Sequence, residues 1–248
     1  VLRLLDRGGR PVTLEELGMS EAVLSRMDEL VRRPHGMILV TGPTGSGKTT
    51  TLYAALARRD AASEKIITVE DPVEYQLPGI TQVPVHRQAG VTFASALRSI
   101  LRQDPDVIMI GEMRDEETAE IAVQSAMTGH LVFSTLHTND AIGALPRLLD
   151  LGIPAYLVVA TVNAILAQRL VRRVCRVCAR PYRPAPADIE RLVGPVEVDG
   201  IEFVRGAGCE ACRGTGYRGR IGIFELLELS EAVREAFLEG RPRGWILN

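Results

Sequence analysis

Short apolar runs alternate with longer amphipathic stretches between residues 37 and 135. The runs contain almost no polar positions, which is typical of strands that are covered on both faces. Strands that alternate with helices favour a mostly parallel sheet. We expect these strands at 37–41, 66–69, 107–110 and 131–135. The pattern therefore predicts an α/β fold.

Helices are expected between these strands and after them. Residues 117–127 carry many small side chains, which would let a helix pack closely on a sheet. Two further helices are predicted at 140–149 and 155–170, separated by Gly152 and Pro154.

The composition is that of an ordinary soluble globular chain. The 248 residues are 46% hydrophobic and 24% charged, which is enough to bury one substantial core. The first residues do not form a secretory signal, and the most apolar stretch, 155–167, is shorter than the ~20 residues of a membrane-spanning helix. We expect a cytoplasmic protein. Its formal charge of -2 lacks the basic excess of nucleic-acid binders, so no nucleic-acid partner is expected.

A glycine-rich loop joins the first predicted strand to a helical run. The segment GPTGSGKT, residues 42–49, follows MILVT and precedes TTLYAALARR, which is the context of a phosphate-binding loop. Glycines let successive backbone N–H groups point at a polyphosphate, Lys48 adds a positive charge, and the Thr49 hydroxyl can bind Mg²⁺. The competing interpretation is a glycine-rich turn that binds nothing. The predicted nucleotide-binding residues are Gly42, Pro43, Thr44, Gly45, Ser46, Gly47, Lys48, Thr49 and Thr50.

Phosphate chemistry also needs an acid at the end of a neighbouring strand, to hold Mg²⁺ or orient water. Glu112 follows the strand 107–110, with Gly111 in the place of the usual aspartate, so Glu112 alone must fill the acidic role there. Glu70 and Glu74 lie at and after the end of the strand 66–69. Taken alone, such acids are more often solvated loop residues. After buried strands of a chain with a phosphate-binding loop, they become candidate site residues.

A polar run follows the strand 131–135 at its carboxyl end, where ligands bind in open α/β sheets. Within it, His137 is a candidate donor to the γ-phosphate. The alternative is a loop histidine bonded to its own backbone.

Four cysteines form two CxxC pairs, separated by thirty residues. In a reducing compartment two such pairs favour a closed, structural Zn²⁺ site over disulfides. A redox CxxC pair and four unconnected thiols are the alternatives. The predicted zinc ligands are Cys175, Cys178, Cys209 and Cys212.

Together, and in this order, these segments resemble the secretion ATPase superfamily that drives type II secretion and type IV pilus assembly. Residues 42–49 match its Walker A motif, 67–75 its Asp box, 102–115 its Walker B motif and 129–141 its His box. The glycine at 111 agrees with the family pattern. The resemblance implies a RecA-like P-loop core with a small tetracysteine zinc module.

The resemblance also implies roles for individual residues. Glu112 would be the catalytic glutamate, with Glu70 and Glu74 aiding Mg²⁺ or water and His137 meeting the γ-phosphate. Two arginines would contact the nucleotide: Arg3 at the γ-phosphate and Arg220 near the base.

The implied protein is a homo-hexameric cytoplasmic motor, peripheral at the inner membrane, that hydrolyses ATP with Mg²⁺. Its partners would be inner-membrane platform proteins and other membrane proteins at the cytoplasmic face of a secretion or pilus machine. A nucleic-acid motor of the DNA-uptake or conjugation type is the alternative, and a nucleotide-sensing subunit that hardly turns ATP over is a third possibility.

The chain begins inside a helix-like segment, VLRLLDR, and its composition changes after Arg173, where Cys, Pro and Arg become frequent. We therefore expect a fragment of a longer protein. The expected parts are a remnant of a preceding domain at 1–34, the ATPase core at 35–173, the zinc module at 174–216 and the start of a C-terminal helical region at 217–248.

Overall fold

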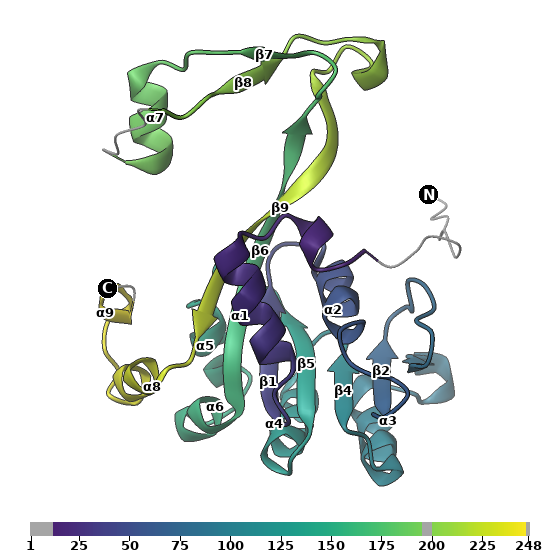
Figure 1. Cartoon of the computed structure of the whole chain (residues 1–248). Coiled ribbons are helices and arrows are strands. Elements are labelled where there is room, and N and C mark those ends of the chain that lie inside the picture. The colour runs from purple at the N-terminus through teal and green to yellow at the C-terminus, as the bar shows by residue number, and fades with distance from the viewer. Residues whose placement is uncertain (1–11, 195–199, 247–248) are drawn as a thin grey trace. The chain divides into compact units, whose positions relative to one another are not determined.

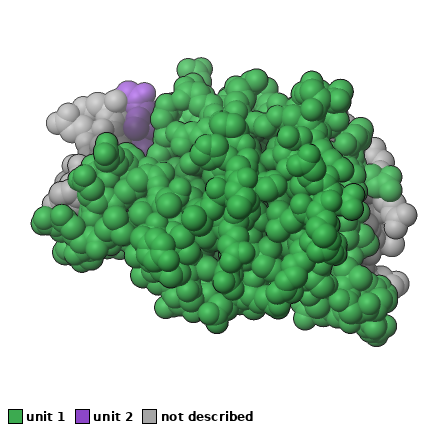
Figure 2. Space-filling model, turned by 90° about the horizontal axis from the view of Figure 1, so that it is seen from below, with its two compact units in different colours: residues 1–169, 222–248 green, residues 170–221 purple. Residues whose placement is uncertain are grey.

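The computed structural model of the chain describes residues 12–194 and 200–246. The chain divides into two compact units, coloured separately in Figure 2. Residues 1–169 and 222–248 belong to the first unit, and residues 170–221 form the second.

The first unit is built on a seven-stranded sheet with the order β3-β2-β4-β5-β1-β6-β9 (Figure 1). Every strand pair from β3 to β6 is parallel, which confirms the expected α/β class. Its strands are β1 (Gly36–Thr41), β2 (Ile66–Glu70), β3 (Thr81–Pro84), β4 (Val107–Ile110), β5 (Leu131–Leu136), β6 (Val162–Val174) and β9 (Tyr217–Glu228).

Helices cover both faces of this sheet (Figure 1). On one face lie α1 (Glu21–Val31) and α2 (Lys48–Leu56), whose apolar side chains form one core cluster with alternate strand residues. The other face carries α3 (Phe93–Ile100), α4 (Glu116–Met127), α5 (Ala144–Asp150) and α6 (Ala155–Thr161), and α8 (Glu231–Leu238) packs there against α6. A short α9 (Arg243–Ile246) follows.

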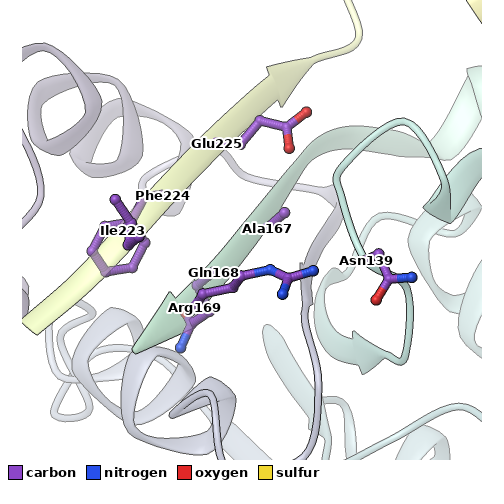
Figure 3. Close-up of a pocket in the computed structure, with 7 residues that line it drawn as sticks. All are labelled: Asn139, Ala167, Gln168, Arg169, Ile223, Phe224 and Glu225. Atoms are coloured by element: carbon purple, nitrogen blue, oxygen red, sulfur yellow. The ribbon is translucent and has the colours of Figure 1, made fainter. Parts of the chain in front are cut away.

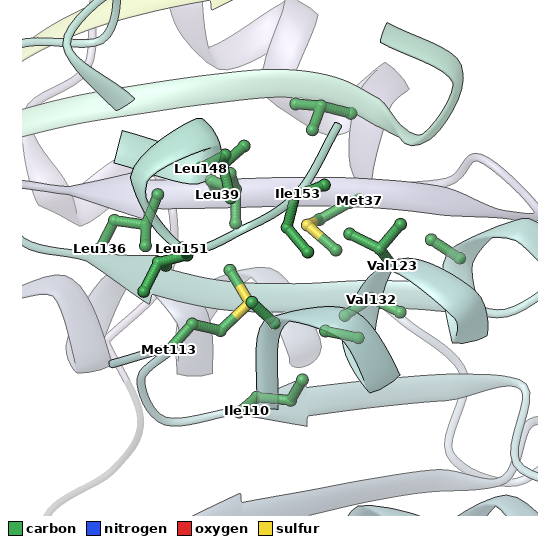
Figure 4. Packing of buried hydrophobic residues seen from close by; sticks show 14 of the residues in the cluster. Met37, Leu39, Ile110, Met113, Val123, Val132, Leu136, Leu148, Leu151 and Ile153 are labelled. Carbon is green, nitrogen blue, oxygen red and sulfur yellow. The ribbon is translucent and has the colours of Figure 1, made fainter. Parts of the chain in front are cut away.

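Strand alternation explains how the core is divided between the two faces. Met37 and Leu39 of β1 face the cluster shown in Figure 4, whereas Ile38 and Val40 face the helices α1 and α2. All six residues of β1 are buried, as expected for a strand covered on both sides. The predicted strands are therefore present, extended by one residue at one end in β1, β2 and β5.

The second unit contains a two-stranded antiparallel sheet of β7 (Ala179–Pro181) and β8 (Val204–Gly206), together with α7 (Pro186–Val193). Its charged side chains lie over aromatic rings, with the Arg172 guanidinium 4.0 Å from the centre of the Tyr217 ring. Cys175, Cys178 and Cys209 lie in the loops next to these strands, and Cys212 is the last residue of a short 3₁₀ helix.

Two expectations about secondary structure were wrong. The predicted helix at 155–170 is helical only as far as Thr161, and β6 begins at Val162. Residues 217–228, placed at the start of a helical region, form the strand β9, and the first helix after it begins at Glu231. In both segments β-branched and large apolar residues pack against sheet neighbours, and this tertiary contact overrides a helical pattern.

Candidate functional site

The order of strands places the predicted motifs next to one another. Strands β2, β4, β5 and β1 are consecutive neighbours in the sheet, and all are parallel. Their carboxyl ends therefore lie along one edge, which is where open α/β sheets bind ligands. At these ends stand Glu70, Glu112, His137 and the loop 42–49.

Three glycines give the loop 42–49 its shape. Gly42, Gly45 and Gly47 have φ angles of 146°, 79° and 87°, in a region that side chains rarely allow. A Cβ atom on Gly42 would lie 2.4 Å from the backbone oxygen of Gln168, so this position has no room for a side chain. Gly47 is the residue before α2, whose first residue is Lys48.

Lys48 is folded back onto its own loop. Its Nζ donates to the backbone oxygens of Gly42 at 2.8 Å and Pro43 at 3.2 Å, and the side chain is nearly buried. Burial lowers the pKa of Lys48, and the negative charge of Glu112 acts in the opposite direction. The ammonium group of Lys48 thus lies inside the curled loop. Thr49 and Thr50, in the first turn of α2, are half-buried.

Glu112 follows β4, which β5 separates from β1, and its negative charge acts on Lys48. Its carboxylate lies 2.7 Å from Nε of Arg114 and 3.6 Å from Nε2 of His137, and its side chain is 17% exposed. Burial and the charge of Lys48 lower the pKa of His137, while Glu112 favours its protonated form. The structure therefore brings Lys48, Glu112 and His137 into one electrostatic group that is open to solvent.

Glu70 has a different environment. It is 2% exposed, and its carboxylate accepts hydrogen bonds from Thr68 Oγ1 at 2.6 Å, from Gln82 Nε2 at 3.1 Å and from the Tyr53 hydroxyl. Burial, followed by the contact with Glu70, raises the pKa of Tyr53. The Tyr53 hydroxyl also accepts from the backbone N–H of Glu74 at 3.3 Å. Glu70 is thus enclosed in a polar network between β2 and α2.

Sequence reasoning missed the partners in this network. Tyr53 lies one turn after the P-loop threonines, and its apolar surroundings on α2 make it look like an ordinary core residue. Gln82 lies on β3, an edge strand that the pattern did not predict. Glu74, in the loop after β2, is half-buried.

The two predicted nucleotide-binding arginines stay predictions. Arg3 lies outside the described residues. Arg220 is exposed on β9, in the second unit.

Residues from both sides of β1 contact its last residue and the loop that follows it. On the β5 side, the Thr41 hydroxyl lies 2.7 Å from the Thr138 hydroxyl and accepts from the Thr138 backbone N–H at 2.9 Å. On the β6 side, Gln168 reaches the loop with its side chain. Beside it lies a hollow of about 180 Å³ that Asn139, Arg169 and residues 223–225 of β9 also line (Figure 3).

The four cysteines of the second unit converge. Their sulfur atoms all lie within 4.8 Å of one another, with 3.9 Å between Cys175 and Cys209 and 3.8 Å between Cys178 and Cys212. Four thiolates at Zn–S bonds of ~2.3 Å in a tetrahedron would be separated by about 3.8 Å. The donor set therefore fits a tetrahedral Zn²⁺.

Backbone N–H groups support one of these thiolates. Burial acts to raise the pKa of Cys212, but the N–H groups of Cys209 and Gly216, together with the side chains of Cys209 and Cys178, outweigh it and lower this pKa to about 6. These donors lie 3.1 and 3.2 Å from the sulfur. Burial raises the pKa of Cys178 to about 11. Metal binding requires deprotonated thiols, so a bound cation would favour all four in that form.

Within the described part of the chain, no helix combines the length and the apolar character that are needed to cross a bilayer.

A family model described as "Type II/IV secretion system protein" matches residues 1–243. Type II secretion system protein HxcR of Pseudomonas aeruginosa is 54% identical over 241 residues, covering 97% of this chain and 48% of that protein. Type II secretion system protein E of Aeromonas hydrophila is 55% identical over 237 residues, covering 95% of this chain and 47% of that protein. The chain thus spans about half the length of these relatives.

A relative from a pilus system and a solved structure are also similar to this chain over most of its length. The type IV pilus assembly ATPase PilB of Thermus thermophilus is 47% identical over 242 residues, covering 97% of this chain and 27% of that protein. Among solved structures, the pilus retraction motor PilT with bound ADP aligns with a TM-score of 0.68 at 32% identity, covering 95% of this chain and 58% of that one.

Proposed function

The chain belongs to the type II/IV secretion system protein family, and from this premise we propose that it is the nucleotide-hydrolysing core of a motor that powers type II protein secretion or type IV pilus assembly. The reaction is the hydrolysis of ATP. The higher identity of the type II relatives described above, 54 and 55% against 47% for PilB, favours secretion as the process served.

One observation carries this proposal: a phosphate-binding loop and three further polar strand ends lie along one edge of a parallel sheet. Glu112 and His137 lie 3.6 Å apart there, and the charge of Glu112 acts on Lys48. Phosphoryl transfer needs mainly positioned charge and an oriented water, because the protein does little covalent chemistry. This edge supplies a cation, a partly exposed carboxylate and an imidazole for that purpose.

The roles of the residues follow from their places. The N–H groups of the loop 42–49 and the Nζ of Lys48 bind the β- and γ-phosphates. Glu112 orients the attacking water, since its carboxylate is the more exposed of the two at the neighbouring strand ends. His137 would donate to the γ-phosphate, and the Thr49 hydroxyl would hold Mg²⁺. When bound, Mg²⁺ would neutralise charge on the phosphate oxygens.

The motor proposed here is a homo-hexamer in the cytoplasm that docks on inner-membrane platform proteins. Family membership supports this assembly. Arg3 and Arg220 are proposed to reach the nucleotide only in the assembled, full-length protein. The near-neutral charge of -2 gives no reason to expect a nucleic-acid substrate.

We assign the four cysteines to one structural Zn²⁺ per chain. The second unit has few apolar side chains that are buried other than the cysteines themselves. Four protein ligands leave no open position for chemistry, so the metal would contribute folding free energy to this unit.

The ATPase site is tested by substituting Lys48 with alanine in the full-length protein. We expect phosphate release to fall to background, because the charge at the centre of the loop is lost. Lys65→Ala is the matched control, since Lys65 is the chain's other lysine and is exposed. Phosphate release by K48A near the wild-type rate would refute the site. A rate that rises when DNA is added would support the nucleic-acid motor instead.

The metal assignment is tested by elemental analysis of the purified protein. We expect one zinc per chain, and loss of that zinc in Cys178→Ser and Cys212→Ser. Protein that is folded by circular dichroism and carries no zinc after preparation without chelators would contradict the assignment.

A further inference from the structure

Gln168 on β6 is buried and bridges the phosphate-binding loop to the helix that follows it. Its Nε2 donates to the backbone oxygen of Ser46 at 2.6 Å, and its Oε1 accepts from the Thr51 hydroxyl at 2.7 Å. Gln168 is 4% exposed and Thr51 is 1% exposed, so solvent does not compete for these bonds. Both ends of the amide are engaged, and the amide orientation is therefore fixed.

The same residue also limits the beginning of the loop. Its backbone oxygen lies only 2.4 Å from the position that a Cβ atom on Gly42 would occupy. Gln168 thus contacts the loop at Gly42, near its end at Ser46, and in the first turn of α2 at Thr51. The Ser46 hydroxyl, in contrast, has no hydrogen-bond partner among the described residues. The side chain of Ser46 therefore gives this peptide no anchor of its own.

The bond to Ser46 has a consequence for the next peptide N–H. The bond between Ser46 and Gly47 is trans, since the cis peptide of the described chain is at Asp71-Pro72. In a trans peptide the C=O and the following N–H point in opposite directions. Because Gln168 holds the Ser46 C=O toward β6, the Gly47 N–H must point away from β6. That N–H comes directly before α2, where an anion meets the helix N-terminus.

We propose that Gln168 is a positioning residue for the nucleotide diphosphate group: by holding the Ser46 carbonyl, it aims the Gly47 N–H at the β-phosphate. This inference rests on the proposed ATP site and adds a residue that neither the loop motif nor the acidic strand ends contain. ADP and ATP both carry a β-phosphate, so Gln168 contributes to the affinity for both nucleotides.

The test measures ADP and ATP affinity by calorimetric titration of the full-length protein. In Gln168→Leu, which can hold neither partner, we expect both dissociation constants to rise about 10- to 100-fold, as for a lost buried hydrogen bond and a misdirected donor. Gln168→Glu keeps an acceptor for Thr51 but loses the donor to Ser46, so its loss of affinity should be at least as large. Thr51→Val leaves the donor in place and should weaken binding less.

Thr161→Val is the matched control. Thr161 is another buried threonine, and its hydroxyl bonds to Leu157 O of its own helix at 2.7 Å, outside the loop. It should lower the thermal stability of the nucleotide-free protein without changing either dissociation constant. If T161V weakens binding as much as T51V, affinity follows general stability and the positioning role is refuted.

The outcomes separate this inference from the proposed function. Wild-type protein that binds neither nucleotide refutes the ATP site itself. Wild-type protein that binds both, with Q168L and Q168E within twofold of it, refutes the role of Gln168 alone. If Q168L does not fold, then Q168E and T51V decide, because each keeps one of the two hydrogen-bonded contacts.

Discussion

Glu70 and Glu112 stand at the ends of neighbouring parallel strands, yet their surroundings are opposite. Glu70 is 2% exposed and accepts hydrogen bonds from three neutral groups. Glu112 has a side chain that is 17% exposed, with a guanidinium 2.7 Å and an imidazole 3.6 Å away. A buried carboxylate that is saturated with donors is held in place. A carboxylate that faces cations and solvent can meet a ligand.

Position at a strand end therefore does not define the role of an acidic residue. Its role depends on the elements that pack over its side chain. Thr68 and Glu70 point to the face of β2 that α2 covers, and Tyr53 of α2 meets the carboxylate there. Glu112 comes two residues after the end of β4 and meets His137, the first residue after β5. From this contrast we expect the chemistry at Glu112 and a structural role for Glu70 in its hydrogen-bonded network.

The strongest test of the contrast is Glu112→Gln. Turnover should fall about 100- to 10,000-fold, the range for loss of a positioned acid or base. ATP affinity should change little, because the loop is intact. Steady-state phosphate release and a binding titration of the same full-length protein measure the two effects. Glu117→Gln is the control, since Glu117 pairs with Arg98 on an exposed surface. Equal loss of binding and turnover in E112Q would contradict its role.

Glu70→Ala should act on stability instead. It removes the acceptor of the Thr68 and Tyr53 hydroxyls and one of the acceptors of Gln82, which should cost about 2–4 kcal/mol of unfolding free energy. Urea denaturation measures this loss. The isosteric Glu70→Gln keeps an acceptor oxygen and should cost less, with turnover reduced by less than about tenfold. The contrast fails if E70Q slows turnover as much as E112Q does.

Tyr53→Phe removes one donor to Glu70 and the acceptor for the Glu74 N–H. We expect a loss of about 1–2 kcal/mol in urea denaturation. Tyr75→Phe is matched to it, because Tyr75 packs edge-on against Tyr53 with 4.6 Å between ring centres and should matter less. The effects of Y53F and E70Q should be non-additive by at least about 0.5 kcal/mol. Additive effects would show that the two side chains act independently.

The smallest expected effect is on His137. Burial and Lys48 lower its pKa, so the imidazole is neutral at pH 7 and takes up a proton only below its ordinary value of ~6.5. The unfolded chain binds that proton more readily, so the folded state loses stability as pH falls below about 6.5. Glu112 favours the protonated form, and E112Q should therefore lower the His137 pKa further. Imidazole resonances followed by NMR measure this. If E70Q shifts the His137 pKa by the same amount, Glu70 and Glu112 influence His137 equally and the contrast between them is wrong.

Much of the parallel core could be predicted because its strands are continuous apolar runs and its loop has a motif. The positions of Lys48, Glu112 and His137 then followed from parallel strands ending at one edge. The network around Glu70 could not be predicted, because Tyr53 and Gln82 reach it from a helix and an edge strand far away in sequence.

The error over residues 155–170 has a similar cause. A central parallel strand is buried on both faces, so β6 shows no alternation and reads as a continuation of α6. The same error explains why Gln168 was not among the predicted site residues. On a helix, Gln168 would have been a single polar residue on an apolar surface. The contact between Gln168 and the loop appears only when β6 is placed beside β1.

The location of β1 between β5 and β6 means that its last residue, Thr41, is held by Thr138, and that the loop after it is held by Gln168. A nucleotide bound as we propose would find this loop already ordered, and its binding would cost little conformational entropy. We therefore expect repeated binding and release of nucleotide to leave the shape of the loop unchanged.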